Sequence, residues 1–86
     1  MKNVVIYSTP TCHFCHMAKE FFTEHNVQFT DYNVATNMEK RSEMIEKSGQ
    51  MGVPVIIIND TDKPNEESDL IIGFDEEALK HTLGIA

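Results

Sequence analysis

Two cysteines separated by two residues, in the segment Cys12-His13-Phe14-Cys15, are the side chains of this sequence best suited to chemistry. Apolar residues at helical spacing begin within this segment, so we expect Cys12 at a helix N-terminus, where unpaired N–H groups and the helix dipole stabilise a thiolate. The pKa of a thiol in such a place falls from about 8.5 to between about 3.5 and 7.5. We therefore expect Cys12 to attack a substrate disulfide. Cys15, one turn further on and less exposed, should resolve the mixed disulfide.

Three other interpretations of the pair remain open. A zinc site needs about four ligands, and His25 and His81 do not stand at ligand spacing from the cysteines. Attachment of a c-type haem fits the literal pattern C-x-x-C-H, because His16 follows Cys15. It would require export, however, and we expect the chain to carry no signal peptide. Two unreactive core cysteines are the third interpretation, although Cys12 follows a turn and not an apolar stripe.

Length and charge limit the class of protein. The chain has 86 residues, which fits one domain spanning 1–86 with a single core. Its net charge of −7, from 14 acidic and 7 basic residues, disfavours nucleic acid and anionic membranes as partners. The apolar runs over 4–7 and 53–58 are shorter than the roughly 20 residues of a membrane helix. Because two cysteines cannot form the disulfide framework of a small secreted domain, we expect a soluble, cytoplasmic protein in a reducing compartment. We also expect a monomer.

The elements that must position the cysteines follow from hydrophobic spacing, caps and turn residues. The predicted order is β-α-β-α-β-β-α, an α/β fold in which three helices flank a four-stranded mixed sheet on both faces. The first β-α-β unit should be parallel, and the strand over 55–58, apolar on both faces, should be central. A polar turn over 59–68 should make a hairpin of the last two strands. The predicted strands span 2–8, 28–33, 55–58 and 69–72, and the helices run from 14 to about 26, from a cap at 36 to about 48, and from a cap at 75 through 83.

Local signals mark the helix ends and the core. Thr36 and Glu39 have the spacing of a capping box, so Thr36 should cap the second helix. Gly49 should end that helix in a left-handed conformation, and Asp75 and Gly84 should bound the last helix. The helical stripe predicts that the first helix buries Met17, Phe21 and Phe22, with Ile45 from the second helix, while Phe14 is shared between the core and the rim of the site.

With these elements, the sequence resembles the glutaredoxin family, and specifically the small bacterial glutaredoxin-like redoxins of the thioredoxin-like superfamily. Four signatures match in order along nearly the whole chain: 5–12 before the motif, 12–19 with the motif, Gly52-Val53-Pro54-Val55, and Ile72-Gly73-Phe74-Asp75. The resemblance implies a thioredoxin-like fold. It also implies a dithiol–disulfide oxidoreductase that reduces protein disulfides or glutathione mixed disulfides through Cys12 and Cys15, without organic cofactor or metal. An iron–sulfur cluster carrier and a dedicated electron donor to one enzyme are the alternatives.

The same resemblance implies a substrate groove. The peptide bond before Pro54 should be cis and lie beside Cys12, and the backbone of Val53 should pair with an extended substrate. Phe14, Gly73, Phe74 and Asp75 should complete the groove, and Asp75 would face the ammonium group of glutathione.

Departures from the family pattern leave the reductant open. Thr9 stands where classical glutaredoxins usually carry a lysine that helps to hold glutathione, and Ile72 precedes a single Gly73 where they have two glycines. Glutathione and a flavoprotein of the thioredoxin reductase type are therefore both candidate electron donors.

The remaining polar groups carry further expectations. His13-Phe14 replaces the familiar Pro-Tyr, so an imidazolium at His13 could tune the Cys12 thiolate, or His13 could simply be solvated. His16 could approach Cys12 but more often such a side chain faces solvent. The acidic stretch over 60–77 is either solvated surface or a docking face for a basic partner.

Overall fold

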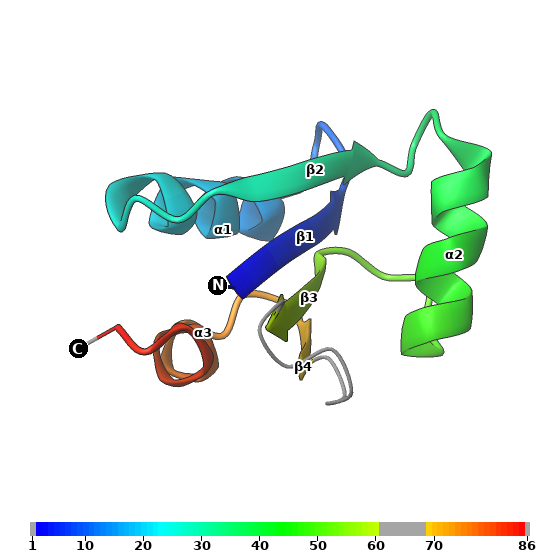
Figure 1. Cartoon of the computed structure of the whole chain (residues 1–86). Helices are drawn as coiled ribbons and strands as arrows, with labels where there is room; N and C mark the ends of the chain where they lie inside the picture. The colour runs from blue at the N-terminus through cyan, green and yellow to red at the C-terminus, as the bar shows by residue number, and fades with distance from the viewer. Residues whose placement is uncertain (1, 61–68, 86) are drawn as a thin grey trace.

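The computed structural model describes residues 2–60 and 69–85 and confirms the predicted order of elements. Figure 1 shows one sheet with helices on both sides. The polar turn predicted at 59–68 begins later than expected, because the third strand continues through Asn59 and Asp60, and residues 61–68 of that turn lie outside the described residues. The elements are β1 (Lys2–Ser8), α1 (His13–Glu24), β2 (Phe29–Asn33), α2 (Met38–Ser48), β3 (Val55–Asp60), β4 (Asp69–Ile72) and α3 (Glu76–Leu83).

The sheet has the strand order β2-β1-β3-β4, so β3 is central as predicted, and β1 is the other central strand. β1 pairs with β2 in parallel, and the other pairs are antiparallel. Tyr7 lies opposite Val55, and Val55 lies opposite Ile72. The end of β1, the start of β3 and the end of β4 therefore meet at one end of the sheet.

Each face of the sheet is covered by its own helices. α1 and α3 lie on one side and α2 on the other (Figure 1). Alternate residues of each strand point to opposite faces, which divides the core into two clusters. The α1 and α3 side buries Val4, Ile6, Ala18, Phe21, Phe22, Ile56, Ile58, Ile71 and Leu79. The α2 side buries Tyr7, Val34, Met44 and Val55.

A polar contact ties α2 to the sheet. The buried Tyr7 hydroxyl donates to Glu43 Oε2 at 2.8 Å, and Lys40 and Lys47 also lie within ion-pair distance of Glu43. Burial and the hydrogen bond to Glu43 raise the pKa of Tyr7 well above its ordinary value, so the phenol stays protonated. The same hydrogen bond, together with the two lysines, lowers the pKa of Glu43.

The helix ends agree with the sequence except at α2. Gly49 and Gly84 follow their helices with φ of 74° and 71°, and Asp75 caps α3. The predicted Thr36 cap is wrong. Asn37 is the N-cap, and its Oδ1 accepts from the N–H of Lys40 at 3.1 Å. Asn and Thr are both preferred caps, and the start of the helix, one residue later than predicted, decides between them.

The predicted apolar stripe of α1 needs one correction. Cys15, Ala18, Phe21 and Phe22 are the buried residues of this helix, whereas Phe14 is 57% exposed and Met17 is half-buried. Residues 15, 18 and 22 follow the i, i+3, i+7 pattern, so the second cysteine itself belongs to the core face. On α2 the buried residue is Met44, while the predicted Ile45 is half-buried and packs against the same cluster. Within the described residues, no helix is long and apolar enough to cross a membrane.

Candidate active site

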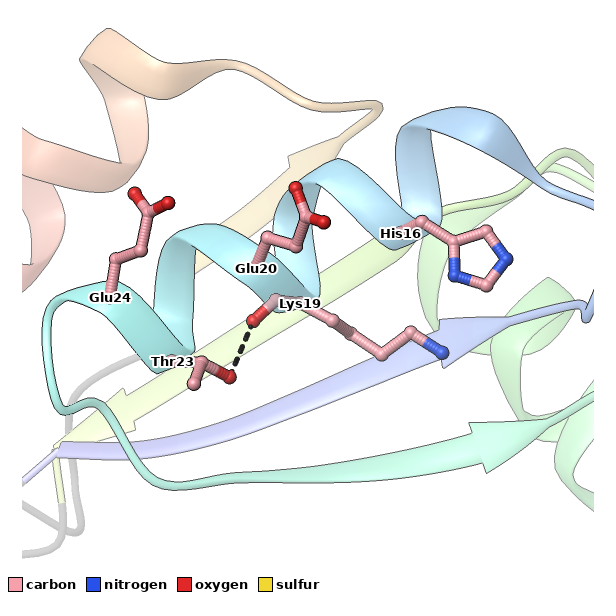
Figure 2. Close-up of a pocket in the computed structure, with 5 residues that line it drawn as sticks. All are labelled: His16, Lys19, Glu20, Thr23 and Glu24. Atoms are coloured by element: carbon pink, nitrogen blue, oxygen red, sulfur yellow. Dashed lines mark hydrogen bonds between the residues drawn. The ribbon is translucent and has the colours of Figure 1, made fainter.

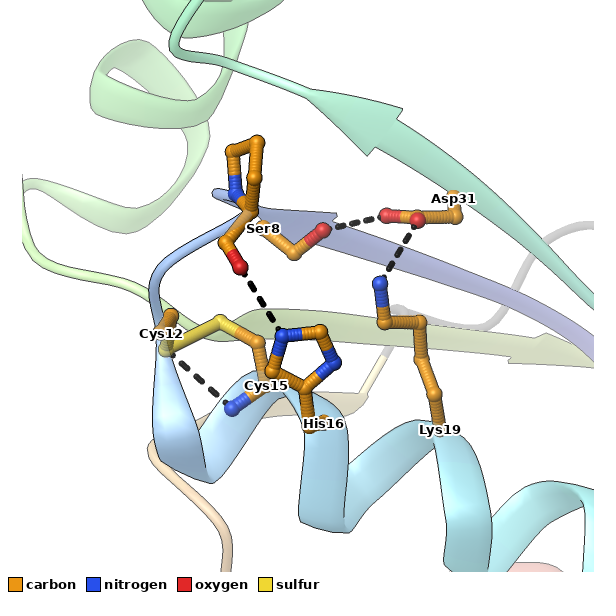
Figure 3. The surroundings of a disulfide bond; sticks show 7 residues. Ser8, Cys12, Cys15, His16, Lys19 and Asp31 are labelled. Carbon is orange, nitrogen blue, oxygen red and sulfur yellow. Dashed lines mark hydrogen bonds and ion pairs between the residues drawn. A yellow bond between two sulfur atoms is a disulfide. The ribbon is translucent and has the colours of Figure 1, made fainter.

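The two cysteines form a disulfide with each other at the start of α1 (Figure 3). Their Cα atoms lie 5.2 Å apart. Cys15 is fully buried, whereas Cys12 is partly exposed. The difference in exposure agrees with the sequence-based expectation. Which sulfur attacks a substrate stays a prediction.

Cys12 is the N-cap of α1. Its backbone is extended, with φ −87° and ψ 112°, and its Sγ accepts from the N–H of Cys15 at 3.1 Å. Sulfur is a weak acceptor as a thiol but carries a full charge as a thiolate, so this N–H and the positive end of the helix favour the ionised form. The chain reaches this position through a reverse turn in which the N–H of Cys12 donates to the carbonyl of Thr9 at 3.3 Å.

Pro54 and Gly73 lie side by side at the same end of the sheet. The peptide bond between Val53 and Pro54 is cis, as the resemblance implied. The N–H of Gly73 donates to the carbonyl of Pro54 at 2.9 Å, which joins the loop before β3 to the loop after β4. Gly73 has φ of 78°, a conformation that favours glycine.

The other predicted groove residues have different surroundings. Phe14 projects into solvent, with its ring 5.6 Å from that of His13, which is itself exposed. Val53 is half-buried against the α2-side cluster. Phe74 is also half-buried. Its ring lies 6.0 Å from that of Phe21, and it packs against the core cluster on the α1 and α3 side. Asp75 is exposed, and its Oδ1 accepts from the N–H of Ala78 at 3.1 Å as the cap of α3.

Several polar contacts beside the disulfide were not predicted from the sequence. Ser8 is buried at the end of β1 and donates to Asp31 on β2, and Lys19 Nζ lies 3.0 Å from the other oxygen of Asp31 (Figure 3). The ring of His16 lies 2.9 Å from the carbonyl oxygen of Pro10. The available signal for the first contact was a serine directly after the apolar run over 4–7. The partners come from separate elements, so sequence spacing could not pair them.

A shallow polar hollow runs along the outer side of α1 (Figure 2). His16 lies at the end of the hollow toward the start of α1, and the ammonium group of Lys19 reaches from the hollow toward the sheet, where Asp31 holds it. Neither cysteine lines this hollow, so it is not the groove predicted from the sequence. Its lining residues are His16, Lys19, Glu20, Thr23 and Glu24.

The pair can accept two electrons from an external dithiol or pass two electrons to an external disulfide, because Cys12 remains accessible and its partner sulfur is one turn away. Among the described residues, no group of three or more His, Cys, Asp and Glu side chains is placed to hold a metal ion. A sheet and helices in this order, carrying such a pair at the first helix N-terminus, define a thiol–disulfide oxidoreductase with a thioredoxin-like fold.

Known proteins narrow this class to one family. The family model described as Glutaredoxin matches residues 4–62, and the chain belongs to the glutaredoxin family. It is 42% identical over 76 residues to an uncharacterized glutaredoxin-like 8.6 kDa protein in the rubredoxin operon of Clostridium pasteurianum, covering 88% of this chain and 91% of that protein. It is also 42% identical over 59 residues to glutaredoxin 3 of Escherichia coli strain K12, covering 69% of this chain and 71% of that protein.

Solved structures support the same fold. A mutant of the thioredoxin-like protein BC3987 superimposes over the whole of both chains with a TM-score of 0.81 and 26% sequence identity. This likeness confirms the thioredoxin-like fold, and membership of the glutaredoxin family confirms the thiol–disulfide oxidoreductase activity that the sequence resemblance implied.

Proposed function

We propose that this protein reduces protein disulfides or glutathione mixed disulfides, with Cys12 as the attacking sulfur and Cys15 as the resolving sulfur. The observation that carries the proposal is the difference between the two sulfurs. Cys12 is partly exposed and caps a helix with its Sγ on a backbone N–H, whereas Cys15 is fully buried. Attack requires a sulfur that is both ionised and accessible, and the N–H contact and the exposure of Cys12 support this role for it.

The exchange takes two steps. In the first, the Cys12 thiolate attacks one sulfur of the substrate disulfide, a mixed disulfide forms, and the other substrate sulfur leaves as a thiolate that takes a proton from water. In the second, Cys15 gives up its proton and attacks Cys12 Sγ, which releases the remaining substrate sulfur. The product is the Cys12–Cys15 disulfide seen in this structure, and two electrons from an external dithiol, or from two glutathione molecules, restore the thiols.

The loops at the end of the sheet support a role in substrate binding. Pro54 and Gly73 are held together by a backbone hydrogen bond, and Val53 precedes the buried proline. An extended substrate segment would pair with the backbone of Val53, in the manner of strand addition. The exposed ring of Phe14, in the first turn of α1, would supply an apolar contact for such a segment.

The choice of electron donor rests on the residues that would contact glutathione. A buckwheat glutaredoxin of this fold has been solved in complex with glutathione, with 18% identity and a TM-score of 0.66. The NrdH-redoxin of Escherichia coli, at 23% identity and 0.73, is a glutaredoxin-like protein with a thioredoxin-like activity profile. Thr9 and the exposed Ile72 leave this chain without the lysine and the second glycine expected for glutathione. We therefore propose a reductase flavoprotein in a reducing compartment as the main donor, and glutathione as the weaker one.

A comparison of reductants tests this assignment. The oxidised protein is supplied with glutathione and its reductase, or with a thioredoxin-reductase-type flavoprotein, and return of free thiols is followed with time. We expect faster reduction by the flavoprotein, and a gain with glutathione in a Thr9→Lys, Ile72→Gly variant. Fast reduction of the unaltered protein by glutathione would refute this choice of donor.

The sulfur roles are tested by trapping. In Cys15→Ser, the resolving step is blocked, so incubation with a protein disulfide should leave a stable mixed disulfide at Cys12 that mass spectrometry detects. A mixed disulfide at Cys15 in Cys12→Ser, formed at the same rate, would show that the roles are reversed.

A further inference from the structure

His16 follows the cysteine pair directly, and neither exchange step uses it. Its ring Nε2 lies 2.9 Å from the carbonyl oxygen of Pro10 (Figure 3). A carbonyl oxygen only accepts, so Nε2 carries a proton and donates it. The side chain is exposed, so burial does not force it into this position. The contact is therefore a specific link from α1 back to the turn that precedes Cys12.

The turn over residues 9–12 can be built in two ways. Its closing hydrogen bond, from the N–H of Cys12 to the carbonyl of Thr9, is 3.3 Å long and hence weak. Pro10 and Thr11 occupy its centre, and the two common turn types differ in the direction of the carbonyl between them. One type needs a positive φ at the second central residue, which a β-branched side chain disfavours. Among the described non-glycine residues, Asn26 alone has a positive φ, so Thr11 does not take that form.

We propose that His16 is a positioning residue for Cys12, because its hydrogen bond to the Pro10 carbonyl fixes the central peptide of this turn. Cys12 takes its N-cap conformation directly after the turn, and its Sγ then lies 3.1 Å from the N–H of Cys15. A thiolate is stabilised by that N–H only while Sγ stays in place. His16 stands one helical turn after Cys12, so its bond makes the reverse turn and the first turn of the helix move as one unit.

The surroundings leave His16 free for this contact. Lys19, Glu20 and Glu24 share the hollow on the outer side of α1 with it. Lys19 is held 3.0 Å from Asp31 on β2, so its ammonium group is directed to the sheet and not to the Pro10 carbonyl. His16 is the described side chain that donates to this carbonyl.

Two substitutions of His16 distinguish the effect of its hydrogen-bond donor from the effect of its ring. His16→Phe keeps a ring but cannot donate, and His16→Gln offers an N–H of similar reach. The exposed His81 on α3 provides a control, His81→Phe. In reduced protein, His16→Phe should shift the thiolate titration of Cys12 upward and slow its reaction with a small disulfide at neutral pH about three- to tenfold, the worth of one hydrogen bond. His16→Gln should restore most of the rate, and His81→Phe should match the unaltered protein.

A second readout reports on the turn without any exchange reaction. In oxidised protein, the amide proton of Cys12 should exchange with solvent faster in His16→Phe than in His16→Gln. The proposal requires both the faster exchange and the shifted titration, and either one without the other overturns it. A His16→Gln variant as slow as His16→Phe would also overturn it, since the donor would then not matter. The inference rests on Cys12 as the attacking sulfur, and that role fails separately if Cys12→Ser retains turnover.

Discussion

The N-terminus of α1 is built like those of α2 and α3 but serves a different purpose. In all three, an extended residue before the helix accepts a hydrogen bond from the N–H three residues further on. The accepting atoms differ: a sulfur at Cys12, an amide oxygen at Asn37 and a carboxylate oxygen at Asp75, each 3.1 Å from its donor. Oxygen caps are worth about 1 kcal/mol to a helix, whereas a thiol is a poor acceptor until it ionises.

The three helices also differ in the acidic residues of their first turns. The first turn of α2 contains Glu39, and that of α3 contains Glu76 and Glu77, but α1 has no acidic residue in its first turn. A carboxylate at a helix N-terminus neutralises part of the positive end of the dipole. In α1, no carboxylate of the first turn neutralises the positive end of the dipole beside Cys12. One capping geometry stabilises two helices, and we propose that, with sulfur in place of oxygen, it activates a nucleophile at the third.

Replacing the cap sulfur of α1 by oxygen should have the largest effect, because it removes the difference between this helix N-terminus and the other two. Cys12→Ser makes the α1 cap an ordinary one, so in reduced protein the free energy of unfolding should stay within about 1 kcal/mol of the unaltered value. Turnover with a model disulfide should fall to background, because a serine hydroxyl does not ionise near neutral pH. Asn37→Ser, which places the same serine cap at α2, should retain full turnover. Substantial activity in Cys12→Ser would show that another group does the chemistry.

An acidic residue in the first turn of α1 should make that helix resemble its neighbours. His13 and Met38 are both exposed first residues of their helices, so His13→Glu and Met38→Glu are a matched pair. His13→Glu should raise the pKa of Cys12 by about half a unit, since a charge at a helix end is worth about 0.3–1 kcal/mol. Thiolate absorbance against pH measures the shift. Equal effects of the two variants would contradict a local role for the α1 terminus.

Removal of an oxygen cap should affect stability alone. Asn37→Ala should lower the free energy of unfolding by about 1 kcal/mol, measured by chemical denaturation, and should leave the rate with a model disulfide unchanged. Thr36→Ala is the control, because the structure places the cap one residue later. A larger loss from Thr36→Ala than from Asn37→Ala would restore the capping box predicted from the sequence.

The smallest effect concerns a carboxylate that has no contact with a helix N-terminus. The Tyr7 hydroxyl and the neighbouring lysines lower the pKa of Glu43 below its ordinary value of 4.5. A lowered pKa in the folded state means that ionised Glu43 stabilises the fold above pH 4.5, and that this contribution is lost as the pH falls through the folded-state pKa. Glu43→Gln should therefore reduce Tm at neutral pH and flatten its decline in acid. Glu46→Gln, at an exposed position of the same helix, should do neither.

The fold could be predicted well because its signals are local. Alternating and continuous apolar runs placed the strands, and Gly49, Asp75 and Gly84 marked helix ends by their intrinsic preferences. The error at Thr36 arose where two good caps stand side by side. Phe14 was placed partly in the core because helical periodicity alone does not show which side chains of the first turn reach the core.

The site was predictable only in part, because much of it depends on contacts between distant segments. The C-x-x-C motif and its place before a helix located Cys12 and Cys15. The contacts of Ser8 with Asp31, and of His16 with Pro10, join different elements or cross a turn, and neither follows from a periodic pattern. The acidic stretch over 60–77, predicted to be either solvated surface or a docking face, stays untested, because residues 61–68 lie outside the described residues.

The most direct test of the central claim is a pH titration of the Cys12 sulfur. In reduced Cys15→Ser, a single cysteine remains, and its ultraviolet thiolate absorbance reports one ionisation. A sulfur that receives a backbone N–H at an unneutralised helix end should titrate between about 3.5 and 7.5. A midpoint at about 8.5 or above, the value of an ordinary thiol, would contradict the account.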